Sequence, residues 1–333
     1  MPTLPIFSFS PILKSTAWGG ERIAPFKGIP SAPAQVGESW EISSVAGSVS
    51  TVSGGPYDGD PLTSLLRAFG PRLVGKSVYR RHGDTFPLLI KFIDAAHDLS
   101  VQVHPDDATA RRLLHSPNGK TEMWFILDCP PEARIVYGFN RPVDPALLRR
   151  HCEEGTLLAL LAHQSVSAGD CIFIPAGRVH AICSGTFLIE VQQTSDATFR
   201  LFDYNRLGAD GRPRALHIDQ AIASIDYPSA TLSGKTTHTI PCEGISRMLS
   251  CPYFSCSRCH LSAPLSLDFS GSDSFHIIIN YRAPLSLTLS GQAPVTVATG
   301  QTVLLPAEAT TVAAAPLAGE PCEFVEVHIE RLP

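Results

Sequence analysis

Apolar and polar side chains alternate in DLSVQVHPDD, residues 98–107, which predicts a β-strand with one polar face. Successive side chains of a strand point to opposite faces, so Ser100, Gln102 and His104 are expected on the same side. A histidine on a polar strand face indicates a metal ligand. The glutamine two residues earlier stands where a second histidine would bind a metal more strongly.

Other strand-like runs follow along the chain: FPLLIKFIDA, EMWFILDCP, ARIVYGF, DCIFIPAGRVHAI and TFLIEVQQTS. Helical spacing interrupts them at about 58–82, 105–116, 143–163 and 216–226. After about residue 230 the sequence becomes Ser/Thr/Pro-rich and strand-like, with frequent turn signals and no helical pattern. We therefore predict a mainly β protein. Residues 1–232 form a β-barrel with helical insertions, and residues 233–333 form a second all-β domain.

Composition excludes several classes of function. A net charge of -5 and the absence of Lys/Arg runs argue against binding nucleic acid. No apolar run reaches the roughly 18 residues that a membrane span needs, and the start of the chain lacks the pattern of a signal peptide. The cysteines number nine and are scattered, which predicts free thiols in a reducing, cytoplasmic environment.

A second informative stretch is GDCIFIPAGRVH, in which a turn, a buried strand and a tight bend lead to His180. A lone histidine is more often a satisfied core residue, but this spacing favours an inward-facing ligand. Glu122 shares a strand face with Trp124; the alternative, an exposed strand carboxylate, fits the apolar neighbours poorly. Gln102, His104, Glu122 and His180 can then converge inside one barrel. Such a donor set suits Zn²⁺, although Mn²⁺, Fe²⁺ or Co²⁺ could also bind.

The spacing around His180 resembles the second motif of cupin barrels, and the chain resembles the type I mannose-6-phosphate isomerases in their shorter bacterial form. The resemblance covers most of residues 10–230. Its markers are AWGG, GESWEIS, PLLIKFIDA, LSVQVHPDD, GKTEMW, IPAGRVHAI and IEVQQTSDATFRLFDYNR. It implies a cupin-type jelly-roll barrel followed by a second, cupin-like C-terminal domain, although the C-terminal third resembles the family only loosely. It also implies one Zn²⁺ per chain and a sugar-phosphate substrate.

The resemblance further implies that Gln102, His104, Glu122 and His180 bind the zinc. It places Lys91, Ser100, Lys120, Glu190 and Arg200 in the sugar-phosphate pocket, with Trp18 at its border. Lys91 lies on an apolar strand, where burying a lysine is unfavourable unless its ammonium pairs with an anion or reaches solvent. Arg200 follows a polar run; pairing with Asp203 is the structural alternative.

Isomerisation of an aldose to a ketose passes through an enediolate, whose negative oxygen Zn²⁺, Arg200 and Lys120 would stabilise. Glu190 is the first candidate for the proton-transferring base, because burial can raise the pKa of a carboxyl toward the working pH. A metal-bound hydroxide is the rival base.

Two other functions compete with the isomerase. A non-catalytic sugar-binding cupin would be expected to have lost Lys120, Arg200 or a metal ligand, and none is missing. A cupin oxidoreductase using Fe²⁺ fits poorly with Lys91, Arg200 and the glutamine at position 102. The cysteine-rich segment CPYFSCSRCH lacks the spacing of a zinc knuckle. We expect a monomer or weak homodimer that binds neither nucleic acid nor membrane.

Overall fold

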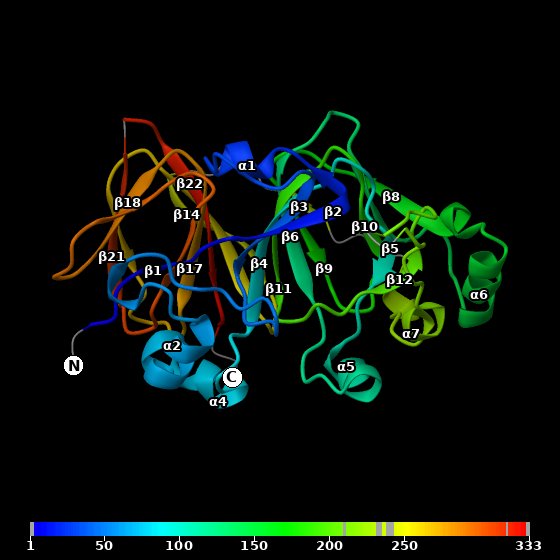
Figure 1. Ribbon diagram of the computed structural model, residues 1–333, viewed down its shortest axis with the longest axis horizontal. Helices are drawn as coiled ribbons and strands as arrows, with labels where there is room; N and C mark the ends of the chain where they lie inside the picture. Colours follow the sequence, from blue (N-terminus) through cyan, green and yellow to red (C-terminus); the bar gives the residue numbers. More distant parts are fainter. Residues whose placement is uncertain (1–2, 209–210, 231–234, 238–242, 318, 331–333) are drawn as a thin grey trace.

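Four layers of β-sheet make up the protein in the computed structural model, which describes residues 3–208, 211–230, 235–237, 243–317 and 319–330. The sheets stack along the long axis of the molecule (Figure 1). A five-stranded and a seven-stranded sheet face each other and form what we call the N-terminal barrel. A six-stranded and a four-stranded sheet form the C-terminal barrel. The prediction of a mainly β protein is confirmed.

The order of the strands across each sheet differs from their order along the chain. The seven-stranded sheet contains, from edge to edge, β13 (Lys235–Thr237), β9 (Asp170–Ile174), β6 (Glu122–Asp128), β11 (Phe187–Gln193), β4 (Leu88–Asp94), β3 (Val36–Ile42) and β2 (Ile12–Gly20). The five-stranded sheet contains β12 (Phe199–Phe202), β5 (Val101–Val103), β10 (His180–Ile182), β7 (Arg134–Phe139) and β8 (Leu161–Ser165). The six-stranded sheet contains β1 (Phe7–Ser8), β20 (Thr302–Leu305), β17 (His276–Arg282), β22 (Cys322–His328), β15 (Ser255–Leu261) and β14 (Gly244–Ser250). The four-stranded sheet contains β16 (Leu265–Asp268), β21 (Thr311–Pro316), β18 (Leu285–Leu289) and β19 (Val295–Val297).

Alternation along each strand decides which layer a side chain enters. On β4, Ile93 packs inside the N-terminal barrel with Trp124 of β6, whereas Ile90 turns to the other face. That outer face packs against the six-stranded sheet, where Ile277 and Val325 belong to the same apolar cluster as Ile90. The two barrels are therefore joined by a continuous hydrophobic layer between their central sheets.

Short helices fill the connections between strands. They are α1 (Ile23–Phe26), α2 (Leu62–Phe69), α3 (Pro71–Val74), α4 (Lys76–His82), α5 (Asp107–Leu114), α6 (Pro145–Glu153) and α7 (Ile218–Ile222), with 3₁₀ turns at Gly55–Tyr57, Leu157–Leu160 and Tyr227–Ser229. The helical pattern expected at about 58–82 is broken into three pieces. Gly70 and Gly75 have φ of 43° and 93°, and a Cβ on Gly75 would lie 2.2 Å from the Asp273 carbonyl oxygen.

Helix α5 separates β5 from β6 and so delays Glu122 relative to His104. Its N-cap is Asp106, whose side chain accepts a hydrogen bond from the Thr109 amide at 2.7 Å. The amide of Lys120 donates to the Pro105 carbonyl at 2.9 Å, which closes the insertion at its base. The chain therefore returns to the same end of the barrel from which it left.

Two strands join the sheet of the other barrel. β1, at the start of the chain, pairs with β20 in the six-stranded sheet. β13, which follows residue 232, pairs with β9 in the seven-stranded sheet. The division of the chain at 232/233 stays a prediction, and these two strands would cross it.

All eight cysteines in the described ranges are free, and five of them are buried. In CPYFSCSRCH, Cys256 packs between the barrels whereas Cys259 packs inside the C-terminal barrel, on the opposite face of β15. Among the described helices, none combines the length and apolarity that a bilayer span requires.

Candidate metal centre

Two rows of polar side chains face each other inside the N-terminal barrel. In the seven-stranded sheet, Lys91 on β4 lies opposite Glu190 on β11, which in turn lies opposite Trp124 on β6. In the five-stranded sheet, Gln102 on β5 lies between His180 on β10 and Arg200 on β12. The neighbours of Gln102 on β5, Val101 and Val103, turn outward into a separate apolar cluster. The alternation read from the sequence thus places Gln102 on the inward face.

Three metal-ligating side chains meet between the two rows: His104, Glu122 and His180. Nε2 of His104 lies 3.4 Å from Glu122 Oε2, and Nε2 of His180 lies 3.3 Å from Glu122 Oε1. Ligands about 2.1 Å from a tetrahedral metal ion are about 3.4 Å apart. These spacings therefore fit ligands around one ion, and they are too long for strong hydrogen bonds.

Backbone carbonyls set the tautomers of both histidines. Nδ1 of His104 is 2.7 Å from the Ala197 carbonyl oxygen, and Nδ1 of His180 is 2.8 Å from the Arg178 carbonyl oxygen. Each Nδ1–H therefore donates outward and leaves the Nε2 lone pair directed at the centre. Burial lowers the pKa of His180 to about 4 and holds that of His104 well below its usual range. Both rings are neutral near pH 7, as metal ligands must be.

Glu122 is fully buried, and among the described residues its Oε1 has no hydrogen-bond partner. Burial raises the pKa of Glu122 to about 7, even though the Lys120 ammonium lies 3.0 Å from Oε2 and favours the charged form. A buried carboxylate with an unsatisfied oxygen is costly unless a cation completes its surroundings. The donor set and the orphaned oxygen both fit a divalent metal ion, and the alternative of an exposed strand carboxylate is excluded.

Gln102 lies at the edge of the same group. Its Nε2 is 3.4 Å from Nε2 of His180, while its Oε1 accepts a hydrogen bond from Ser100 Oγ at 3.0 Å. Rotating the Gln102 side-chain amide by 180° exchanges the positions of Oε1 and Nε2. Oε1 would then point to the centre, and Nε2 would donate a hydrogen bond to Ser100. Ser100 therefore contacts Gln102 and is placed to orient it.

Lys91 and Glu190 form a buried ion pair beside the centre. Nζ of Lys91 lies 3.1 Å from Glu190 Oε1 and 3.4 Å from Glu38 Oε2, so the lysine does not reach solvent. Glu190 Oε2 accepts a hydrogen bond from Trp124 Nε1 at 3.0 Å. Burial raises the pKa of Glu190, but Lys91 and then Lys120 outweigh it and lower this pKa to about 2. The expectation that burial would raise it overall was wrong, because the sequence does not reveal which cation lies opposite Glu190.

Arg200 is half-buried, and within the described ranges its Nε has no hydrogen-bond partner. Burial, and next the charge of Arg214, lower its pKa. Asp203 does not pair with Arg200: its carboxylate is bound by Arg206 at 2.7 Å and by Arg214 at 2.6 Å. Among the described residues the structural alternative for Arg200 is therefore absent, and Arg200 lies opposite Gln102 on the neighbouring strand.

Trp18 and two unpredicted residues complete the surroundings. Trp18 is buried in the apolar cluster that also contains Trp124, so it supports the wall of the site. Glu38 and Trp40 on β3 contact Lys91: the carboxylate as an ion pair, and the indole ring with its centroid 5.1 Å from Nζ. The alternation Glu38-Ser39-Trp40 within GESWEIS is the signal that could have placed both residues on the inward face.

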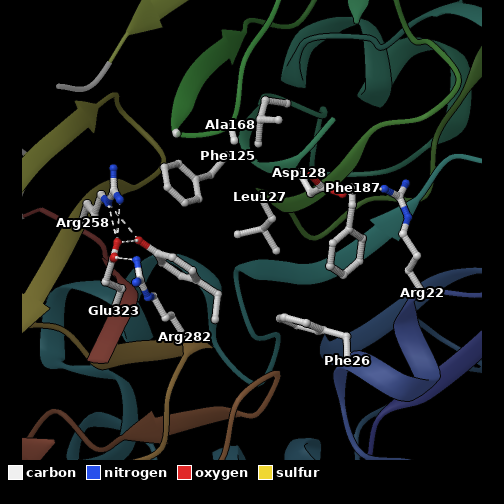
Figure 2. A pocket seen from close by; sticks show the side chains of 13 residues that line it. Arg22, Phe26, Phe125, Leu127, Asp128, Ala168, Phe187, Arg258, Arg282 and Glu323 are labelled. Carbon is white, nitrogen blue, oxygen red and sulfur yellow. Dashed lines mark hydrogen bonds and ion pairs between the residues drawn. The ribbon is translucent and has the colours of Figure 1, made fainter. Parts of the chain in front are cut away.

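A separate cavity of ≈ 550 Å³ lies where the two barrels meet (Figure 2). Phe26, Phe125, Leu127 and Phe187 form its apolar side. On the other side Arg258, Tyr281 and Arg282 bind the carboxylate of Glu323. None of the predicted site residues lines this cavity. It is distinct from the metal centre.

Comparisons with known proteins point to one family. Residues 6–127 match the family described as phosphomannose isomerase type I, catalytic domain. Mannose-6-phosphate isomerase ManA of Bacillus subtilis is 38% identical over 278 residues, which cover 80% of this chain and 82% of that protein. The mannose-6-phosphate isomerase of Streptococcus mutans is 36% identical over 270 residues, covering 79% and 81%.

The crystal structure of the mannose 6-phosphate isomerase from Bacillus subtilis superposes with a TM-score of 0.86 at 30% sequence identity. It covers 97% of this chain and 99% of that one. This match extends the likeness to the C-terminal barrel, where the sequence resemblance was loose, and it confirms the cupin-type fold. The chain belongs to the type I phosphomannose isomerase family.

Proposed function

We propose that the protein is a metal-dependent aldose–ketose isomerase that interconverts mannose 6-phosphate and fructose 6-phosphate, with Zn²⁺ as the first-choice metal. One observation carries the proposal. Two neutral histidines surround a buried carboxylate at the spacing of tetrahedral ligands, beside a lysine–glutamate pair and a half-buried arginine. Family membership supplies the substrate class, a hexose phosphate.

His104, Glu122 and His180 would hold the metal, with the amide oxygen of Gln102 as a fourth ligand. A bound Zn²⁺ would act as a Lewis acid that polarises the carbonyl and hydroxyl oxygens of the sugar. Glu122 would be the only charged ligand, so the ion would keep a net positive charge, which favours its action as a Lewis acid.

Lys91 is proposed to bind the substrate phosphate. Its ammonium is already held inside the barrel by Glu190 and Glu38, so binding an anion costs little further ordering of the side chain. Burial lowers the pKa of Lys91, but the two carboxylates outweigh this and raise it overall, so the side chain is charged at working pH.

Glu190 remains the candidate base, acting through Oε1. With its pKa near 2 the carboxylate is deprotonated and able to accept a proton, but it is a weak base. A phosphate dianion beside Lys91 would offset the lysine's charge and raise the pKa of Glu190. Oε1 would then take the proton from the carbon next to the carbonyl and return it to the neighbouring carbon. Lys120 and Arg200 would place positive charge near the oxygens of the enediolate.

A coupled assay of fructose 6-phosphate formation from mannose 6-phosphate tests the proposal. The protein is stripped of metal with a chelator and then supplied with Zn²⁺, Mn²⁺ or Co²⁺ in separate arms. We expect no turnover after stripping and recovery on adding metal. Absence of turnover in every arm would favour a sugar-binding protein without catalysis. Full turnover in the stripped protein would remove the metal from the mechanism.

The oligomeric state, monomer or weak homodimer, and the cytoplasmic location stay predictions. Gel filtration with light scattering measures the first.

A further inference from the structure

A second group of metal-ligating side chains lies in the C-terminal barrel: His276, Glu326 and His328. His276 on β17 lies directly opposite His328 on β22, and Glu326 is two residues before His328 on the same strand. In this arrangement all three side chains project from one face of a two-strand ladder. The cluster shares no residue with the N-terminal metal centre.

That face is the interior of the C-terminal barrel. Ile278 on β17 and Phe324 on β22 lie on the same strand face as the cluster and pack in the apolar core between the six- and four-stranded sheets. Ile277 and Val327 point the other way, into the layer that joins the two barrels. The cluster is therefore inside the second barrel, and the six-stranded sheet separates it from the N-terminal barrel.

The three side chains contact one another closely. Nδ1 of His276 lies 2.6 Å from Glu326 Oε1, and Nδ1 of His328 lies 2.9 Å from the same oxygen. His276 and Glu326 are each 3% exposed, and Phe269 stacks on the His276 ring with the centroids 3.8 Å apart. Within the described ranges Nε2 of His276 has no hydrogen-bond partner. Burying the His276 imidazole with an unpaired ring nitrogen beside the Glu326 carboxylate is costly unless the group binds something.

A cavity of ≈ 440 Å³ adjoins the cluster and includes Ser257, Asp268 and Asp273 in its lining. It offers room for water or a small ligand next to the three side chains. A group of three protein ligands facing a cavity has the form of an open metal site, in which a further position is left for an exchangeable ligand.

We propose that His276, Glu326 and His328 form a second divalent-cation site, selective for a borderline transition ion such as Zn²⁺ or Co²⁺. Two imidazole nitrogens and one carboxylate oxygen are the donors that such ions prefer. The histidine–carboxylate contacts in this cluster are shorter than the 3.3 and 3.4 Å at the N-terminal centre. When an ion binds through both Nδ1 atoms, each neutral imidazole carries its single proton on Nε2 instead, and the ligand atoms separate to about the spacing of the N-terminal centre.

The test isolates the second site by removing the first. The full-length His104→Ala variant is stripped of metal and titrated with Co²⁺. Visible absorption of bound Co²⁺ and metal content after gel filtration are then measured. We expect one equivalent of Co²⁺ per chain in His104→Ala. We expect none in His104→Ala/His328→Ala or in His104→Ala/Glu326→Gln, the second of which preserves side-chain volume if the first folds poorly.

His104→Ala/His260→Ala is the matched control. His260 lies on β15 of the same sheet and approaches Glu323, outside the cluster. This control should keep the equivalent of Co²⁺. No bound Co²⁺ in His104→Ala, or the same binding after Glu326→Gln, would overturn the proposal and leave the cluster as a hydrogen-bonded triad.

The outcome is independent of the isomerase assay, because no variant in this titration needs to turn over substrate. In a background with His104 intact, His328→Ala should lose one metal equivalent and retain isomerase activity.

Discussion

Replacing Lys91 with methionine tests the buried ion pair beside the metal centre. Met fills a similar volume but leaves Glu190, 3% exposed, without its cation 3.1 Å away. Removing one partner of a buried pair costs about 3–5 kcal/mol, because the remaining charge is uncompensated. For a chain of this size the melting temperature should fall by about 4–7 °C, measured by scanning calorimetry at pH 7.5.

The stability deficit of Lys91→Met should depend on pH in a definite direction. In the wild type, Lys91 helps to hold the pKa of Glu190 at about 2, below its ordinary value of 4.5. The carboxylate therefore adds stability above pH 4.5 that is lost as the pH falls toward 2. In Lys91→Met that stabilisation is missing, so the deficit should be fully present at neutral pH and should shrink when acid protonates Glu190.

Two variants serve as comparisons. Lys91→Met/Glu190→Gln removes both charges and should recover much of the lost stability. Lys76→Met, at an exposed lysine, should change the free energy of unfolding by less than about 0.5 kcal/mol. The reasoning is refuted if Lys91→Met melts within about a degree of the wild type, or if the double variant is less stable than the single one.

Three further predictions concern the metal centre. His104→Ala should lose both the catalytic metal and turnover, measured by elemental analysis and the coupled assay; a variant that retains full activity would contradict the ligand assignment. Arg200→Ala should keep that metal and lose most of kcat, because Arg200 is placed to stabilise charge rather than to bind the ion; loss of the metal would contradict its role. Gln102→Ala should weaken metal binding less than His104→Ala does, since an amide oxygen is the weaker ligand; chelator competition compares the two variants.

Alternation along single strands could be predicted from sequence because it is local. It placed Gln102 on the inward face of β5, and the structure places Val101 and Val103 on the opposite face. The same rule explains why Glu122 and Trp124 both turn inward on β6. A mainly β chain with a polar interior row follows from these patterns alone.

Pairings between distant segments could not be predicted in this way. The contact of Lys91 with Glu190 depends on the register of β4 against β11, which no local pattern specifies. Without that register, the direction in which the pKa of Glu190 shifts could not be known. The pairing of β1 and β13 with the sheet of the other barrel could not be predicted either, because it depends on which sheet edges are left unpaired.

The second histidine–glutamate cluster was missed for the same reason. Glu326 and His328 are two residues apart and share a face, but His276 lies about fifty positions earlier. Only the pairing of β17 with β22 brings His276 beside them.

Anomalous diffraction from crystals of the Zn²⁺-reconstituted protein, recorded on both sides of the zinc absorption edge, tests the central claim most directly. We predict an anomalous peak inside the N-terminal barrel, about 2.1 Å from Nε2 of His104 and of His180 and from a carboxylate oxygen of Glu122. Active, reconstituted protein with no anomalous density between these three side chains would contradict the account.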